Sequence, residues 1–92
     1  MNTERSRPKI SNAQRRVLEA LAREGATIED DGDYVDIRGA GVHHFTRPML
    51  ERLLKNDWVA LVCERRKVIR YGFYRTYAIT DLGLAALKDP RL

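Results

Sequence analysis

The chain has 92 residues, which is enough for one small domain and too few for two independent hydrophobic cores. Hydrophobic residues make up 43% and charged residues 33%, so we expect folding without help from a metal or a disulfide. No apolar run approaches the length of a membrane span, no secretory signal is recognisable, and Cys63 is the single cysteine. The sequence therefore predicts a cytoplasmic protein with no membrane partner.

Charge is distributed unevenly along the chain, although its formal total is only +4. Residues 26–40 carry one basic and five acidic side chains, whereas residues 41–80 carry eight basic and three acidic ones. The second segment is compatible with a nucleic-acid role, because phosphate neutralisation by Lys and Arg supplies most non-specific affinity. A charge of +4 does not by itself establish that role.

The N-terminal residues predict an arm followed by a helix. Residues 1–9 have no apolar periodicity and are expected to form a flexible basic arm outside a single domain over residues 10–92. Ser11 and Gln14 have the spacing of a capping box, which predicts a helix that starts at Asn12 and ends in the left-handed conformation at Gly25. Its expected buried stripe consists of Ala13, Val17, Leu18, Leu21 and Ala22.

Two short alternating runs around an Asp-Gly turn predict a β-hairpin after that helix. Thr27 and Ile28 precede the turn, residues 34–37 follow it, and the acidic tip between them is expected to lie in solvent. The acidic residues lack the ligand spacing of a calcium loop, so a surface that docks on a basic protein is the more useful hypothesis. The residues concerned are Glu29, Asp30, Asp31, Asp33 and Asp36.

The run from Thr46 to Trp58 predicts an amphipathic helix. Thr46 is its expected N-cap, Pro48 lies in its first turn, and Asn56 is expected to end it in the left-handed conformation. The apolar stripe consists of Met49, Leu50, Leu53 and Leu54. The opposite face carries Arg47, Glu51, Arg52 and Lys55. One face of this helix can join a core while the other presents charge to a partner.

Residues 58–65 and 73–80 predict a long hairpin with a basic tip. The basic residues at or near that tip are Arg65, Arg66, Lys67, Arg70 and Arg75. Thr80 is a good N-cap for a last short helix, in which Leu84, Ala85 and Leu87 are expected to close the core before Asp89 and Pro90 end it.

The run TRPMLERLLKNDWVAL and the later run YAITDLGLAAL together resemble the second half of winged helix-turn-helix proteins. In that family the second wing strand ends in a tyrosine, a hydrophobic residue, a threonine and then a glycine, which here are Tyr77, Ile79, Thr80 and Gly83. The resemblance covers residues 46–87 well. It departs from the family between Gly25 and Gly41, where an acidic, glycine-rich segment replaces the usual second helix.

The resemblance implies an α+β, winged-helix-like fold with three helices, a C-terminal two-stranded wing and an extra short acidic hairpin. It also implies that Arg47, Arg52 and Lys55 enter a major groove of double-stranded DNA. The wing residues would reach the flanking backbone or the minor groove: Arg65, Arg66, Lys67 and Arg70. Arginine forks suit guanine edges, and lysines on a hairpin suit phosphates.

No cofactor, metal or catalytic site is expected. His43 and His44 are adjacent and match no zinc spacing, and Cys63 is expected to pack as a small apolar residue. Tyr71 and Tyr74 are suited to stacking on bases, whereas Phe73 and Tyr77 are assigned to a core or a dimer contact. Nothing in the sequence points to an enzyme, because no nucleophile has an assignable base.

The sequence is compatible with two functions from different classes. The first is a small DNA-binding regulator of bacterial or phage type, for which a homodimer is plausible because one such module buries little surface. The second is a protein-binding winged helix, either an adaptor or a phage-type inhibitor of a nucleic-acid machine, that docks through its acidic segment. The missing second helix and the run from Glu29 to Asp36 favour the second.

Overall fold

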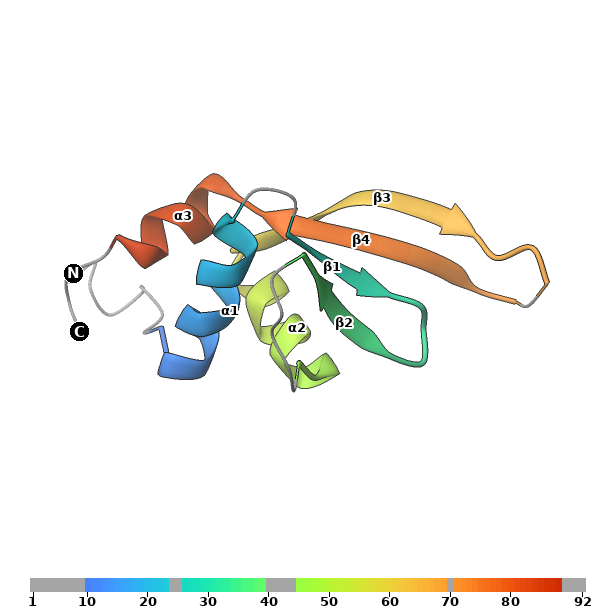
Figure 1. Ribbon diagram of the computed structural model, residues 1–92, viewed down its shortest axis with the longest axis horizontal. Helices are drawn as coiled ribbons and strands as arrows, with labels where there is room; N and C mark the ends of the chain where they lie inside the picture. The colour runs from blue at the N-terminus through green and yellow to red at the C-terminus, as the bar shows by residue number, and fades with distance from the viewer. Residues whose placement is uncertain (1–9, 24–25, 40–44, 70, 89–92) are drawn as a thin grey trace.

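A four-stranded antiparallel sheet and three helices make up the structure, which is a computed structural model that describes residues 10–23, 26–39, 45–69 and 71–88 (Figure 1). The sheet order is β2-β1-β4-β3, so the two C-terminal strands join the two N-terminal ones through β4. The strands are β1 (Thr27–Asp30), β2 (Val35–Arg38), β3 (Val59–Arg66) and β4 (Phe73–Ile79). The helices are α1 (Asn12–Ala22), α2 (Arg47–Lys55) and α3 (Asp81–Leu87). The predicted α+β class and the three predicted helices are confirmed.

Helix α1 begins as the sequence predicts. The Ser11 amide donates to Gln14 Oε1 at 2.9 Å, and the Gln14 amide donates to Ser11 Oγ at 3.1 Å, which completes the capping box. The predicted buried stripe was too wide, because Ala13 and Ala22 are exposed while Gln14 is buried. The helix ends in an extended residue, Arg23, and Gly25 lies outside the described residues.

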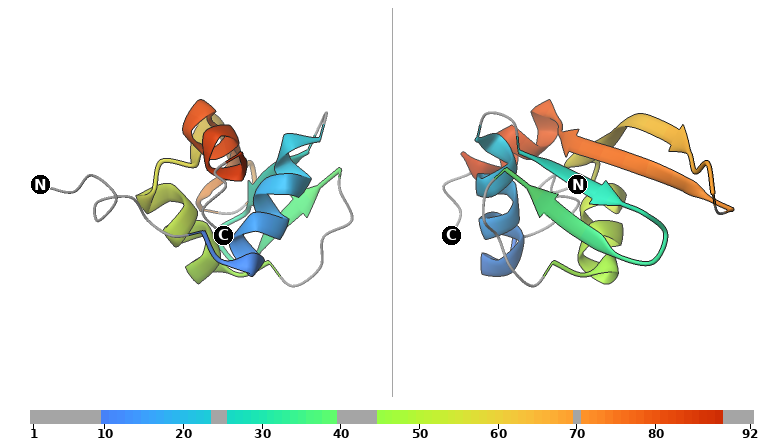
Figure 2. Two further views of the ribbon diagram at one scale, coloured as in Figure 1. Left: turned by 90° about the vertical axis from the view of Figure 1, so that its left-hand side faces the viewer. Right: turned by 45° about the vertical axis from the view of Figure 1, so that its right-hand side comes forward.

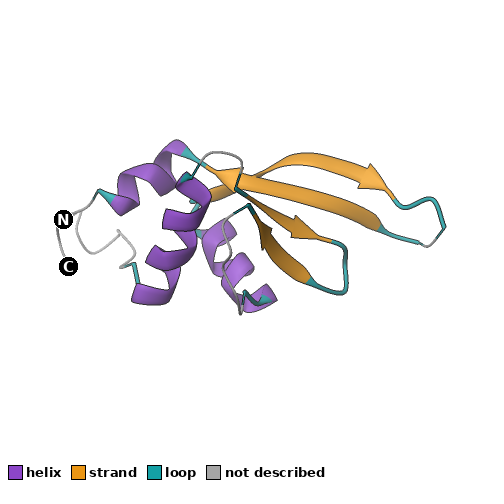
Figure 3. Ribbon diagram, in the orientation of Figure 1, coloured by secondary structure: helices purple, strands orange, loops and turns teal. Residues whose placement is uncertain are grey.

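The core lies between the helices and the sheet face that Ile28, Ile37 and Tyr77 form. Ile28 is the register partner of both Ile37 in β2 and Tyr77 in β4, so these three side chains share one face. Leu18, Leu50 and other helix residues pack against them. Each of the three helices has at least one residue in this cluster or packed against it. Figure 3 shows the three helices gathered toward one end of the sheet. Residues 26–39 contain the β1–β2 hairpin and no helix.

The β1–β2 hairpin differs from its prediction at the turn. Glu29 and Asp30 belong to strand β1, and Asp30 is 4% exposed, so the prediction that the acidic tip lies in solvent was wrong for this residue. Tyr34 stands outside β2 and is exposed. The alternation of a half-buried strand explains this result, because Asp30 shares the core face with Ile28.

Helix α2 leads through a tight turn into β3. Leu50 and Leu53 are buried and Thr46 is the N-cap, although its side chain makes no capping hydrogen bond. The left-handed residue of the turn is Asp57, at φ +58°, and not Asn56 as predicted. The amide of Trp58 then donates to the Leu53 carbonyl at 3.0 Å. Trp58 is buried, which fixes the start of β3 against the core.

Strands β3 and β4 form a ribbon that extends past the β1–β2 hairpin, away from the helices (Figure 1 and Figure 2). Its register shifts between Leu61 and Cys63, which leaves Val62 as a bulge. Cys63 is exposed, so the prediction that it packs as a small apolar residue was wrong. Phe73 was assigned to a core or a dimer contact and is 42% exposed, so it is not a core residue.

Helix α3 packs closely against the start of β3. Thr80 caps it as predicted, since its Oγ1 accepts from the Gly83 amide at 3.0 Å. A Cβ atom on Gly83 would lie 2.3 Å from the Trp58 carbonyl oxygen, so only glycine fits there. Leu87 packs on the core, whereas Leu84 and Ala85 are exposed and do not close it. Asp89 and Pro90 lie outside the described residues. None of the described helices is long and apolar enough to cross a bilayer.

Candidate nucleic-acid interface

The exposed face of α2 carries two of the predicted DNA-binding residues. Arg52 and Lys55 lie in the last turn of the helix and are exposed, as is Glu51 beside them. Leu50 and Leu53 hold the opposite face in the core. No ion pair joins Arg52 or Lys55 to another described residue. These two cations are therefore available to a partner.

Arg47, at the start of the same helix, is held by the β1–β2 hairpin. Its Nη1 donates to Asp30 Oδ2 at 3.0 Å and its Nη2 to Asp30 Oδ1 at 2.8 Å, a two-pronged contact with a carboxylate that is almost completely buried. The Gly32 amide also donates to Asp30 Oδ1 at 2.8 Å. The hydrogen bonds from Arg47 lower the pKa of Asp30, and the same contact raises the pKa of Arg47. This pair joins a predicted DNA-binding residue to a predicted protein-binding one.

The charged row continues across the sheet on the same face. Asp30 is the register partner of Arg75 in β4, and Arg75 is in turn the register partner of Glu64 in β3. Arg75 Nε donates to Glu64 Oε2 at 2.6 Å, which raises the pKa of Arg75. Acidic and basic side chains thus alternate from α2 to the outer strand. These contacts connect α2 to the sheet, and the opposite charges of neighbouring side chains in the row compensate one another.

Strand alternation assigns the basic residues of β3 to different faces. Arg66 shares the helix side of the sheet with Glu64, and Arg65 lies on the opposite side. Arg65 stacks over the Tyr74 ring, with 5.6 Å from its guanidinium carbon to the ring centroid. Both arginines are exposed. Arg66 therefore faces the same way as α2, while Arg65 does not.

Lys67 links the ribbon to the turn of the other hairpin. Its ammonium group donates a hydrogen bond to the backbone carbonyl of Asp31 and lies 5.3 Å from the centroid of the Tyr74 ring. The carboxylate of Asp31 accepts from the amides of Tyr34 and Asp33 at 2.7 and 2.8 Å, and these contacts lower its pKa. Lys67, predicted to bind DNA, is thus engaged inside the molecule.

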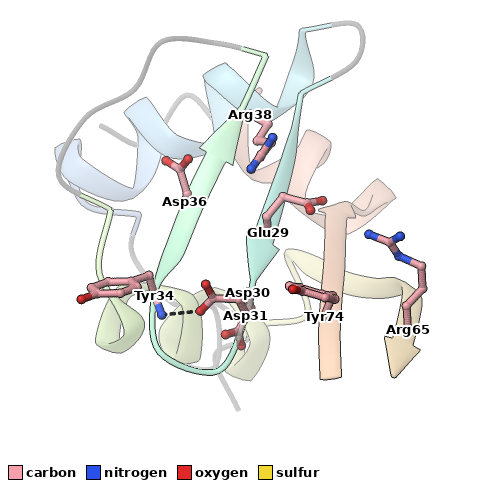
Figure 4. Close-up of a pocket in the computed structure, with 8 residues that line it drawn as sticks. All are labelled: Glu29, Asp30, Asp31, Tyr34, Asp36, Arg38, Arg65 and Tyr74. Carbon is pink, nitrogen blue, oxygen red and sulfur yellow. Dashed lines mark hydrogen bonds between the residues drawn. The ribbon is translucent and has the colours of Figure 1, made fainter. Parts of the chain in front are cut away.

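The acidic segment is divided between the two faces of the sheet. Figure 4 shows Glu29 and Asp36 on the side away from the helices, beside Arg38. Glu29 Oε2 accepts from Thr76 Oγ1 at 2.8 Å. A hollow of about 370 Å³ opens on this side, lined by Glu29, Asp30, Asp31, Tyr34, Asp36, Arg38, Arg65 and Tyr74. Glu29 and Asp36 therefore do not share a face with α2, and Asp30 is neutralised by Arg47.

The tip of the ribbon is apolar as well as basic, and its apolar residues were not among the predicted site residues. Val68, Ile69 and Tyr71 are 98%, 96% and 99% exposed. The signal in the sequence was the pair Val68-Ile69 inside a turn, where polar residues are usual. Phe73 follows them at the start of β4.

Several predicted features lie outside the described residues: Arg70, His43, His44 and the arm over residues 1–9. Within the described ranges, no three His, Cys, Asp or Glu side chains are grouped as metal ligands. Comparisons with protein families, with curated proteins and with solved structures find no match to this chain. The functional argument therefore rests on the arrangement of the side chains.

Proposed function

We propose that this protein binds double-stranded DNA as a regulator that acts by occupying its site. Helix α2 would enter the major groove, and the β3–β4 ribbon would act as a wing on the flanking backbone. In this proposal the fold is a variant of the winged helix in which β2 stands in the place of the second helix. The order α1, β1, β2, α2, β3, β4 and the pairing of β1 with β4 support that assignment.

The observation that carries the proposal is the position of the unpaired cations. Arg52 and Lys55 project from α2, and Arg66 lies on the same side of the sheet at the far end of the ribbon. Asn56 and Asp57 alone connect the helix to the ribbon's base at Trp58, so the two elements are held in a fixed relation. This spacing suits a helix in one groove and a hairpin on the adjacent backbone.

The structural contacts give the predicted residues different roles in this proposal. Arg52 would read base edges, because its guanidinium can bind guanine at two atoms, and Lys55 and Arg66 would contact phosphates. Arg47 is instead a positioning residue, since Asp30 holds it against the sheet. Lys67 positions the β1–β2 turn through the Asp31 carbonyl.

Fluorescence anisotropy with a labelled duplex at several salt concentrations tests the proposal. Arg66→Ala and Lys55→Ala should each weaken binding on all sequences and reduce the slope of log affinity against log salt by about one. Arg52→Ala should lower the preference for the best sequence by about 1 to 3 kcal/mol. Arg16→Ala, an exposed arginine on α1, is the charge-matched control. Absence of binding to every duplex at low salt contradicts the proposal.

The side of the sheet that faces away from the helices, called the open side below, favours a second candidate function, which is a protein-binding domain. Its hollow combines Asp36 and Glu29 with the exposed rings of Tyr34 and Tyr74, and none of its lining residues comes from a helix (Figure 4). Acidic and aromatic side chains together suit a basic peptide or protein surface. The variant Asp36→Lys, which reverses a charge in the lining of this hollow, should then lose the captured partner while keeping duplex affinity. Retention of every partner by this variant counts against the candidate.

A further inference from the structure

The apolar tip of the ribbon is not explained by folding. Val68, Ile69 and Tyr71 are almost fully exposed, and none of them joins the core cluster. Single exposed apolar residues are ordinary, but several together at the end of a projecting hairpin mark a contact surface. A hollow of about 720 Å³ lies at this tip, lined by Arg66, Lys67, Val68, Ile69, Tyr71, Gly72 and Phe73. The tip therefore presents apolar side chains with cations directly behind them.

The cations lie on both faces of the ribbon. Arg66 is on the helix side, whereas Arg65 is on the open side, where Lys67 lies over the same Tyr74 ring as Arg65. A partner that fits must therefore offer anionic groups on both sides of the tip and an apolar surface between them. The minor groove of a DNA duplex has phosphates along both walls, and the apolar faces of the bases lie between those walls where a base step is unstacked. A flat membrane surface offers its anionic groups on one side only.

We infer that the ribbon tip inserts Val68 and Ile69 between adjacent base pairs from the minor groove and kinks the duplex. Apolar wedges of this kind unstack one base step and bend DNA toward the major groove. Gly72, at φ +113°, closes the turn without a side chain, so the tip stays narrow. Arg65 and Arg66 then meet the phosphates on either wall. This inference rests on the proposed binding to DNA and adds a deformation of the DNA to it.

Two fluorescent duplexes test the inference with the whole chain. One carries 2-aminopurine, a base analogue that brightens when it is unstacked, next to a central TA step, which is easily opened. The other carries a donor and an acceptor dye at its two ends. The test variant is Val68→Ser, Ile69→Ser, which should fold normally because both side chains are exposed. Arg66→Ala is the matched control, and thermal melts of all three proteins verify folding.

The wild-type protein should bind, raise the 2-aminopurine signal and shorten the distance between the dyes. The Val68→Ser, Ile69→Ser variant should bind about tenfold more weakly and give neither signal, with an unchanged salt dependence. Arg66→Ala should show the reverse: a reduced salt dependence and an intact bend.

Other outcomes separate this inference from the proposed function. If the wild type binds the duplex without unstacking or bending it, or if the double variant still bends it, the wedge is refuted while DNA binding stands. If no duplex binds at all, the proposed function fails together with the wedge. If the protein instead binds vesicles that contain phosphatidylserine, and the double variant does not, the tip is a lipid contact and the inference is overturned.

Discussion

The β1–β2 hairpin ends in charged residues that other parts of the chain hold, whereas the β3–β4 ribbon ends in apolar side chains that are almost fully exposed in the part of the chain that the structure describes. Asp30 is bound by Arg47 and by the Gly32 amide, and the carbonyl of Asp31 is bound by Lys67. Ile69, at the other tip, is 96% exposed. The number of charged residues in a segment is therefore a poor guide to how many of them are available to bind a partner. The acidic hairpin uses Asp30 and Asp31 to build its own turn, whereas the apolar tip of the basic ribbon stays outside the core that the described residues form.

The largest expected effect comes from the base of the ribbon. Gly83→Ala should lower the free energy of unfolding by about 3 kcal/mol, because the new methyl group would overlap the Trp58 carbonyl oxygen and Ile79. Helix propensity alone predicts the opposite, a gain of about 1 kcal/mol. Ala85→Gly, at an exposed position of the same helix, is the control and should lose about 1 kcal/mol. Urea denaturation measures both, and a stabilised Gly83→Ala protein contradicts the close contact.

The next largest effect is expected when the ion pair between Arg47 and Asp30 is removed, because this pair holds the β1–β2 hairpin to α2. Arg47→Ala should cost about 2 kcal/mol in urea unfolding, because it leaves a nearly buried carboxylate with the Gly32 amide as its remaining donor. Arg52→Ala, on the exposed face of the same helix, should stay within about 0.5 kcal/mol of the wild type. Equal costs for the two arginines would show that the pair with Asp30 does not hold the hairpin.

The pH dependence of stability gives a second test of the pair between Arg47 and Asp30. The folded-state pKa of Asp30 is lowered, chiefly by its hydrogen bonds to Arg47, so its contribution is complete above the unfolded-state pKa of about 3.9 and is lost as the pH falls through the lower folded-state value. Asp31 adds a contribution of the same sign through its bonds to the amides of Tyr34 and Asp33. Asp30→Asn and Arg47→Ala should therefore flatten part of the acid slope in thermal melts between pH 5 and 2. An unchanged slope in both variants would rule out the pair as its source.

The smallest expected effect concerns the link between the two tips. Lys67→Ala should cost about 0.5 to 1 kcal/mol, because it removes one partly exposed hydrogen bond. Its clearer signature should be faster hydrogen exchange at the amides of Gly32 and Asp33 in the β1–β2 turn. Arg66→Ala, one residue away on the other face of the ribbon, should leave that exchange unchanged. Faster exchange in both variants would indicate a general loosening of the ribbon.

Most of the correct predictions about the fold came from short sequence patterns. The capping box of Ser11, the N-cap at Thr80 and the Asp-Gly hairpin were all correct, because each depends on contacts within a few residues. The turn after α2 was misplaced by one residue, since both Asn56 and Asp57 tolerate the left-handed conformation and only the packing of Trp58 selects between them.

The candidate site was harder to predict, because its decisive contacts join distant segments. Nothing in the sequence indicates that Arg47 meets Asp30 or that Lys67 meets Asp31; both contacts depend on the pairing of β1 with β4. The prediction that Cys63 packs as a small apolar residue followed the usual burial of cysteine, but β3 is an edge strand, and Cys63 lies on the sheet face opposite the core residue Tyr77 and is exposed.

The pairing of β1 with β4 also constrains how the chain folds. Both hairpins and all three helices form through contacts between residues that are near one another in the chain. Completing the sheet requires Ile28 to meet Tyr77, which closes a loop over about half of the chain. The rate-limiting event in folding is therefore expected at the seam between β1 and β4, and substitutions at these two buried positions should slow refolding more than changes in either hairpin turn.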